Sequence, residues 1–150
     1  MSDATVFIVD DDQAVARSLR WLIETVRLNV ETFASAQAFL DGYDASKRGC
    51  LVLDLRLPGM SGLELQEYLK QRGIEIPIVF VSAHGDIPAA VSAIKGGAVD
   101  FIQKPFSYRE VLAVIGKAMA RDDEIRALRA RRLAIAGRLA ALTERESDVL

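Results

Sequence analysis

The sequence is poor in the features that mark secreted and membrane proteins. It holds a single cysteine, Cys50, which excludes a disulfide framework and fits a reducing compartment. No stretch approaches the ~18 uncharged apolar residues of a membrane span. The 19 basic and 21 acidic residues leave a net charge of -2, which favours neither a nucleic-acid nor a membrane surface. The first residues lack the pattern of a signal peptide, so we expect a cytoplasmic protein.

The chain has ample material for one core and a regular alternation of patterns. Its 150 residues are 51% hydrophobic, enough for one domain and a tail. Five short apolar runs typical of buried strands alternate with amphipathic segments of helical spacing, and they begin near Thr5, Val30, Cys50, Ile78 and Phe101. This alternation predicts an α/β fold, a flavodoxin-like doubly wound (βα)5 arrangement with parallel strand order 2-1-3-4-5.

Local signals mark the predicted helix ends. Ser and Asp residues are favoured as N-caps, and two of them precede a glutamate at capping-box spacing. The predicted caps are Asp12, Ser35, Ser61 (with Glu64), Asp86 and Ser107 (with Glu110). Gly96 and Gly97 end the fourth helix. Trp21 and Cys50 are interpreted as packing residues, and His84, the only histidine, as structural.

The last helical segment is too long for one small domain. A single helix from Ser107 to Leu142 would reach about 50 Å. Residues 121–124 are charged and interrupt its apolar stripe, and an apolar seam with Arg132 in one place follows. We therefore predict that residues 1–122 form the domain and 123–141 a helical linker. The linker either pairs with a copy of itself or is a solvated tail.

Polar residues gather where the predicted strands end. Asp10 and Asp11 follow the first strand, and Asp54, Ser82 and Lys104 follow the third, fourth and fifth. The carboxyl ends of parallel strands share one edge, and ligands bind there where the strand order reverses. Topology therefore predicts that three carboxylates, a hydroxyl and an ammonium converge.

The charges of this set predict a metal. Two like charges 4 Å apart repel by about 4 kcal/mol at an effective dielectric of about 20, and one lysine does not offset three carboxylates. Oxygen ligands of this kind suit Mg²⁺. A phosphoryl group would suit the open side of the ion, and a neighbouring carboxylate can act as its acceptor.

Four motifs carry a resemblance to a known family. They are Val9-Asp10-Asp11, the run from Leu53 to Gly62, Val81-Ser82-Ala83 and Lys104-Pro105-Phe106. Together they resemble the receiver domain of two-component response regulators, over residues from about 4 to 121. The stretch from Ser82 to Phe106 further resembles the FixJ-like branch of the LuxR-type transcriptional regulators.

The resemblance implies a role for each matched residue. Asp54 would be the phosphoacceptor, modified by a sensor histidine kinase and assisted by Ser82 and Lys104. Mg²⁺ would be held by Asp10, Asp11, Asp54 and the backbone carbonyl of Arg56. The switch residues would be Ser82, Ala83, Phe101, Lys104 and Pro105, with a cis Lys104–Pro105 bond. Phosphorylation would favour a homodimer through the fourth helix, the fifth strand or the linker.

The end of the chain carries a second resemblance. Residues 142–150 resemble the start of a LuxR-type helix-turn-helix domain, with Thr143 and Glu146 at capping-box spacing. The alternative is an ordinary amphipathic helix. No recognition helix is included, so promoter DNA would be bound only through an output domain that is mostly missing. The chain itself is then a regulatory domain and not an enzyme.

Three other functions compete with that of a phosphorylated receiver. A phosphatase of the haloacid-dehalogenase type would use Asp10 as its nucleophile, but that family places an acidic pair after the fourth strand, where Ser82-Ala83-His84 stands. A receiver that serves only as a binding module is disfavoured by its complete acidic site. A flavin site is disfavoured because the first loop is acidic. Within the resemblance, Gly96 replaces a usual alanine, and Phe101 lacks the hydroxyl of a tyrosine.

Overall fold

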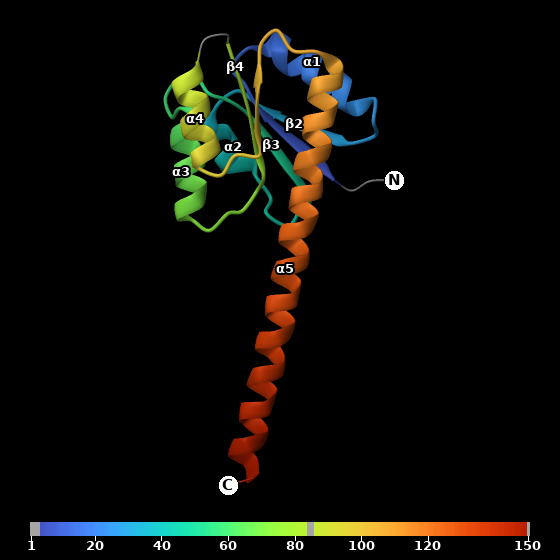
Figure 1. Cartoon of the computed structure of the whole chain (residues 1–150), viewed down its shortest axis with the longest axis vertical. Helices are drawn as coiled ribbons and strands as arrows, with labels where there is room; N and C mark the ends of the chain where they lie inside the picture. Colours follow the sequence, from blue (N-terminus) through green and yellow to red (C-terminus); the bar gives the residue numbers. More distant parts are fainter. Residues whose placement is uncertain (1–3, 84–85, 150) are drawn as a thin grey trace.

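The structure is a computed structural model that describes residues 4–83 and 86–149, with side chains up to residue 141. Within these residues, five strands form one parallel sheet: β1 (Thr5–Val9), β2 (Asn29–Phe33), β3 (Gly49–Asp54), β4 (Ile78–Ser82) and β5 (Asp100–Gln103). Five helices within the described residues alternate with these strands: α1 (Gln13–Glu24), α2 (Ala36–Gly42), α3 (Gly62–Gln71), α4 (Ile87–Lys95) and α5 (Tyr108–Val149). The strand order β2-β1-β3-β4-β5 confirms the predicted doubly wound fold (Figure 1).

Helices cover both faces of the sheet. α1 and the first turns of α5 pack on one face, and α2, α3 and α4 pack on the other (Figure 1). Every residue of β1, β3 and β4 is buried as a result. The two-sided burial explains why these strands are apolar along their whole length and do not alternate.

Most predicted helix ends are confirmed. Asp12 accepts hydrogen bonds from the N–H groups of Ala14 and Val15 at 3.0 and 3.4 Å. Ser61 and Glu64 form a complete capping box, and Ser35 and Ser107 accept from backbone N–H groups at 3.1 Å each. Asp86 is the exception, because its side chain makes no cap hydrogen bond.

Gly96 has a packing role that its sequence position does not reveal. A Cβ at this position would lie 2.7 Å from Oε1 of Gln66. Gln66 is buried and donates its amide N–H to the carbonyl of Ala93 at 2.9 Å. The missing methyl group therefore makes room for a polar contact between α3 and the end of α4.

Two packing predictions have different outcomes. Cys50 is fully buried in β3, and burial raises the pKa of its thiol to about 12. Trp21 was predicted to pack but is 64% exposed, because it lies on the outer side of α1 with its ring 6.4 Å from that of Tyr108. The structural role predicted for His84 lies outside the described residues.

α5 is a single helix that leaves the domain and projects away from it (Figure 1). Val111, Ile115 and Ala118 bury its first turns, whereas every side chain from residue 127 to 141 is exposed. The helix also continues through Thr143, where the sequence predicts a new helix start. The apolar side chains between residues 127 and 141 of the predicted linker are therefore open to solvent. None of the described helices has both the length and the apolar content that a bilayer crossing needs.

The charged segment at residues 121–124 does not interrupt α5. Asp122 is buried there and accepts hydrogen bonds from the backbone N–H of Gly49 at 3.0 Å and from Nε of Arg126 at 2.9 Å. Asp123 pairs with Arg48 at 2.8 Å beside it. These contacts hold α5 against the start of β3 at the point where the helix leaves the domain.

Candidate functional site

Two neighbouring strands bring acidic residues to the carboxyl edge of the sheet. Val9 of β1 lies opposite Leu53 of β3, so the residues that follow them in the sequence, Asp10 and Asp54, lie side by side. Asp10 is 2% and Asp54 7% exposed, whereas Asp11 is open to solvent. One carboxylate oxygen from each of these three residues lies within 4.8 Å of the others. The carboxylates therefore converge where the strand topology places them.

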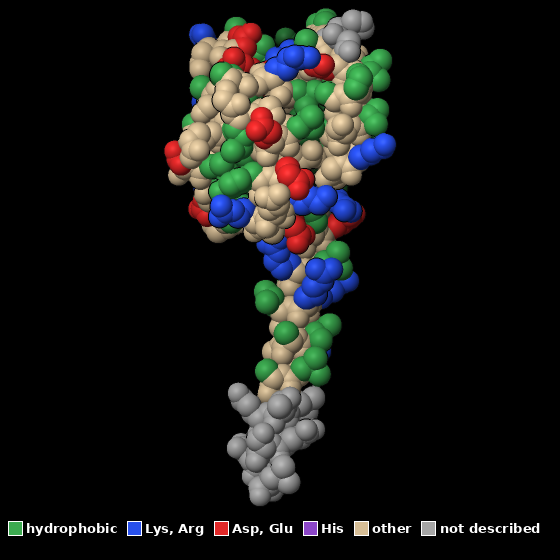
Figure 2. Space-filling view, turned by 90° about the vertical axis from the view of Figure 1, so that its left-hand side faces the viewer, with side chains coloured by type: hydrophobic (Ala, Val, Ile, Leu, Met, Phe, Trp, Pro, Cys, Tyr) green, Lys and Arg blue, Asp and Glu red, His purple; other side chains and the backbone are tan. Residues whose placement is uncertain are grey.

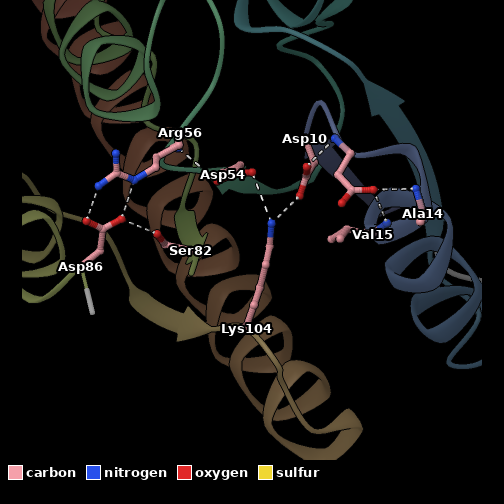
Figure 3. Close-up of polar contacts among 9 residues, drawn as sticks. Asp10, Ala14, Val15, Asp54, Arg56, Ser82, Asp86 and Lys104 are labelled. Carbon is pink, nitrogen blue, oxygen red and sulfur yellow. Dashed lines mark hydrogen bonds and ion pairs between the residues drawn. The ribbon is translucent and has the colours of Figure 1, made fainter. Parts of the chain in front are cut away.

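Lys104 reaches this cluster from the connection between β5 and α5. Its Nζ lies 3.4 Å from Oδ2 of Asp10 and 3.4 Å from Oδ2 of Asp54 (Figure 3). Its backbone N–H donates to the carbonyl of Ser82 at 2.7 Å. The Lys104–Pro105 peptide bond is cis, as the resemblance implies. Burial opposes the charge of Lys104, but the two carboxylates outweigh it and raise its pKa.

The cluster keeps an excess of negative charge. Burial raises the pKa of Asp10, and the Asp54 carboxylate adds to the rise. The backbone N–H of Asp12, 2.8 Å from Oδ1 of Asp10, opposes the rise, as does Lys104. One ammonium faces three carboxylates, and hard oxygen donors with surplus charge are the set that Mg²⁺ takes. Asp10, Asp11 and Asp54 therefore fit a divalent cation.

Ser82 reaches the same edge, but its hydroxyl is engaged by a residue outside the cluster. Ser82 is buried at the end of β4, and its Oγ donates to Oδ2 of Asp86 at 2.8 Å (Figure 3). Asp86 precedes α4 and was predicted to cap it. The cap prediction is wrong because the carboxylate turns away from the helix and toward the site.

Arg56 holds the same carboxylate from the other side. Its Nε and Nη2 donate to the two oxygens of Asp86 at 3.0 and 2.8 Å, a bidentate pair. Its backbone N–H donates to Oδ1 of Asp54 at 3.1 Å. The hydrogen bonds from Arg56 and Ser82 hold the pKa of Asp86 below its usual range, and Asp86 raises that of Arg56. The sequence did not indicate Asp86 as a site residue, because an aspartate at the start of a helix is sufficiently explained as an N-cap.

The other predicted switch residues lie on β5 or next to Ser82 and Lys104 in the sequence. Phe101 is half-buried on β5 and packs against the core cluster on the α2, α3 and α4 side. Ala83 and Pro105 are exposed, next to Ser82 and Lys104. The structure thus brings Lys104 onto the carboxylates and leaves the Ser82 hydroxyl on Asp86.

Comparison with known proteins adds the family. The model of the response regulator receiver domain matches residues 6–116. The response regulator protein TodT of Pseudomonas putida is 45% identical over 152 aligned residues, which cover 100% of this chain and 67% of TodT. The transcriptional regulatory protein FixJ of Azorhizobium caulinodans is 41% identical, over 97% of this chain and 69% of FixJ. The chain spans about two thirds of the length of these relatives.

Solved structures agree in fold and in sequence. The response regulator StyR is 44% identical with a TM-score of 0.85, over 91% of this chain and 69% of StyR. The FixJ-N crystal structure is also 44% identical, with a TM-score of 0.74 over 80% of this chain and 96% of that one. Nothing in these matches supports the haloacid-dehalogenase alternative. With the acidic edge, the lysine and these matches in agreement, the chain belongs to the response regulator receiver family, in its FixJ-like, LuxR-type branch.

Proposed function

We propose that Asp54 accepts a phosphoryl group from the phosphohistidine of a sensor histidine kinase. One observation carries this proposal: Asp54 is buried at the end of β3, with Nζ of Lys104 3.4 Å from its Oδ2 and Asp10 beside it. In the transfer, a carboxylate oxygen of Asp54 bonds to phosphorus while the bond from phosphorus to the histidine nitrogen breaks. The nitrogen keeps the electron pair.

The neighbouring residues then bind the new group. Lys104 pairs with a phosphoryl oxygen, and the Ser82 hydroxyl donates to another. Asp10, Asp11, Asp54 and the backbone carbonyl of Arg56 would hold Mg²⁺, whose charge offsets that of the carboxylates and the phosphoryl oxygens. Phosphorylation adds about one negative charge and three acceptor oxygens to the edge.

The switch follows from Ser82 and Phe101. As Ser82 turns to the phosphoryl group, Phe101 rotates inward, and the face of α4 and β5 changes shape together with Ala83 and Pro105. Ile87, Val91 and Ile94 are exposed on α4. They give the phosphorylated chain an apolar surface for a homodimer. A shift of this equilibrium from 1:99 to 99:1 needs about 5.5 kcal/mol of differential interaction.

The same proposal covers the organisation of the longer protein. Residues 1–122 are the receiver, 123–141 the linker, and 142–150 the start of a LuxR-type helix-turn-helix domain. Promoter DNA is bound only through that output domain, and the names of two relatives, the transcriptional regulatory proteins TdiR and FixJ, support a role in transcription. The receiver acts in the cytoplasm as a regulatory phosphoprotein, with no catalysis beyond slow self-dephosphorylation.

Phosphotransfer to Asp54 is tested with acetyl phosphate as donor. We expect Mg²⁺-dependent incorporation of one phosphoryl group, lost completely in Asp54→Asn. Asp41→Asn is the matched control, because Asp41 is exposed on α2 and accepts a hydrogen bond from Gln37, one turn earlier in the same helix, at 2.8 Å. Label retained in Asp54→Asn would refute the role of Asp54. Label lost in Asp10→Asn but retained in Asp54→Asn would favour the phosphatase chemistry instead.

A further inference from the structure

One carboxylate joins two residues of the site that lie far apart in the sequence. Asp86 accepts the hydroxyl of Ser82 at 2.8 Å and both donors of the Arg56 fork at 3.0 and 2.8 Å. Figure 3 shows Arg56 and Ser82 both pointing at Asp86 and away from Lys104. The contact bridges 30 residues and links the segment after the phosphoacceptor strand to the start of α4.

Helix capping does not explain the orientation of the Asp86 side chain. Asp86 stands where an aspartate usually caps a helix, yet its side chain makes no cap hydrogen bond. A side-chain cap hydrogen bond stabilises the start of a helix, so Asp86 gives up a common local contribution to the stability of α4. Instead, the Asp86 carboxylate forms a bidentate ion pair with Arg56 and accepts a hydrogen bond from the hydroxyl of the buried Ser82.

The Ser82 hydroxyl cannot serve two acceptors. A serine carries one O–H proton, so it donates either to Asp86 or to an oxygen of a group on Asp54. The proposed function requires the second arrangement, whereas the structure has the first. Any ligand that recruits Ser82 must therefore first break its bond to Asp86, and that cost lowers the affinity for the ligand.

We propose that Asp86, anchored by Arg56, is a positioning residue that holds Ser82 in the unmodified state and sets how readily the site takes a phosphoryl group. This inference rests on the proposed function of Asp54. Arg56 has two roles in it. Its backbone N–H contacts the acceptor Asp54, and its side chain fixes the carboxylate that competes for Ser82.

The test measures the affinity of the full chain for beryllofluoride, a phosphoryl mimic, in the presence of Mg²⁺. We expect Asp86→Ala to bind it about tenfold more tightly than wild type, the lower end of the effect of a hydrogen bond to a charged group. Arg56→Ala releases Asp86 without altering α4, so it should shift affinity in the same direction by less. Asp123→Ala is the matched control, because it breaks an Arg–Asp contact of 2.8 Å at the opposite edge of the sheet.

A double-mutant cycle separates positioning from a general structural effect. In the Ser82→Ala background, Asp86→Ala should change the affinity less than twofold, because no hydroxyl remains to be released. A second readout is taken on the variant without metal or mimic: the amide resonance of Ser82 in free Asp86→Ala should lie closer than that of free wild type to its position in beryllofluoride-bound wild type.

The outcomes distinguish this inference from the function on which it rests. Equal affinity of wild type and Asp86→Ala, or an equal gain with and without Ser82, would overturn the positioning role while Asp54 chemistry stood. Failure of wild type to bind beryllofluoride at all would remove the proposed function, and this inference with it.

Discussion

The two edges of the sheet both bury aspartates, but they balance the charge differently. At the amino edge, Asp122 takes the N–H of Gly49 and the guanidinium of Arg126 at 3.0 and 2.9 Å. At the carboxyl edge, Asp10 and Asp54 share one ammonium at 3.4 Å each, with Asp11 close by. A matched carboxylate holds two elements together. At the carboxyl edge, the carboxylates outnumber the ammonium group and repel one another. A cation that binds there relieves this repulsion, which favours its binding.

Figure 2 shows basic side chains on the domain where α5 leaves it. Arg48 and Arg126 belong to this region, and both pair with aspartates of α5. Arg126 also donates to the backbone carbonyl of Lys47. The amino edge therefore anchors α5 to the domain at the point where the helix leaves it.

The largest effect is expected from closing the space at the amino edge. A Cβ at Gly49 would lie 1.7 Å from the carbonyl oxygen of Thr5, so Gly49→Ala forces β1 and β3 apart. We expect a loss of at least about 4 kcal/mol in the free energy of unfolding, measured with urea. Gly116→Ala is the control, because a Cβ there meets nothing within 4 Å. A Gly49→Ala protein as stable as wild type would contradict this packing.

The next largest effect is expected when the buried Asp122 carboxylate is removed from its two donors. Asp122→Ala leaves Nε of Arg126 and the N–H of Gly49 without their acceptor, so we expect a loss of about 3 kcal/mol in the free energy of unfolding. Its exposed neighbour Asp123 pairs with Arg48, and Asp123→Ala should cost less than about 1 kcal/mol. Urea unfolding of both variants measures the difference. Equal losses would mean that the buried pair is no more than a surface ion pair.

The smallest expected change is a gain in stability, and it tests the excess of negative charge at the carboxyl edge. Asp10→Asn removes one like charge but keeps an acceptor for the N–H of Asp12, so without metal it should stabilise the fold by about 1 kcal/mol. Burial raises the pKa of Asp10 in the folded state. The folded protein therefore holds this proton more tightly than the unfolded chain. Its stabilising contribution is full below the unfolded pKa and is lost as the pH rises through the folded pKa.

This sign is checked by thermal unfolding with a chelator from about pH 4 to about pH 8. The advantage of Asp10→Asn should grow with pH over that window. Added Mg²⁺ should reverse the order by stabilising wild type more than the variant. A variant less stable than wild type across the whole window, without metal, would show that Asp10 is as well matched as Asp122.

The sequence by itself determined the strands, their order, most helix caps and the meeting of Asp10, Asp54 and Lys104. Apolar runs and capping spacings act over a few residues, and the right-handed crossover rule turns them into a topology that fixes which strand ends are neighbours. Only the tertiary structure decided that Asp86 serves Ser82 and Arg56 instead of α4, and that Asp122 is buried against Gly49. These contacts join residues up to 73 positions apart in the sequence. Such contacts form only when packing has set the distance and orientation of the helices and strands that carry the side chains.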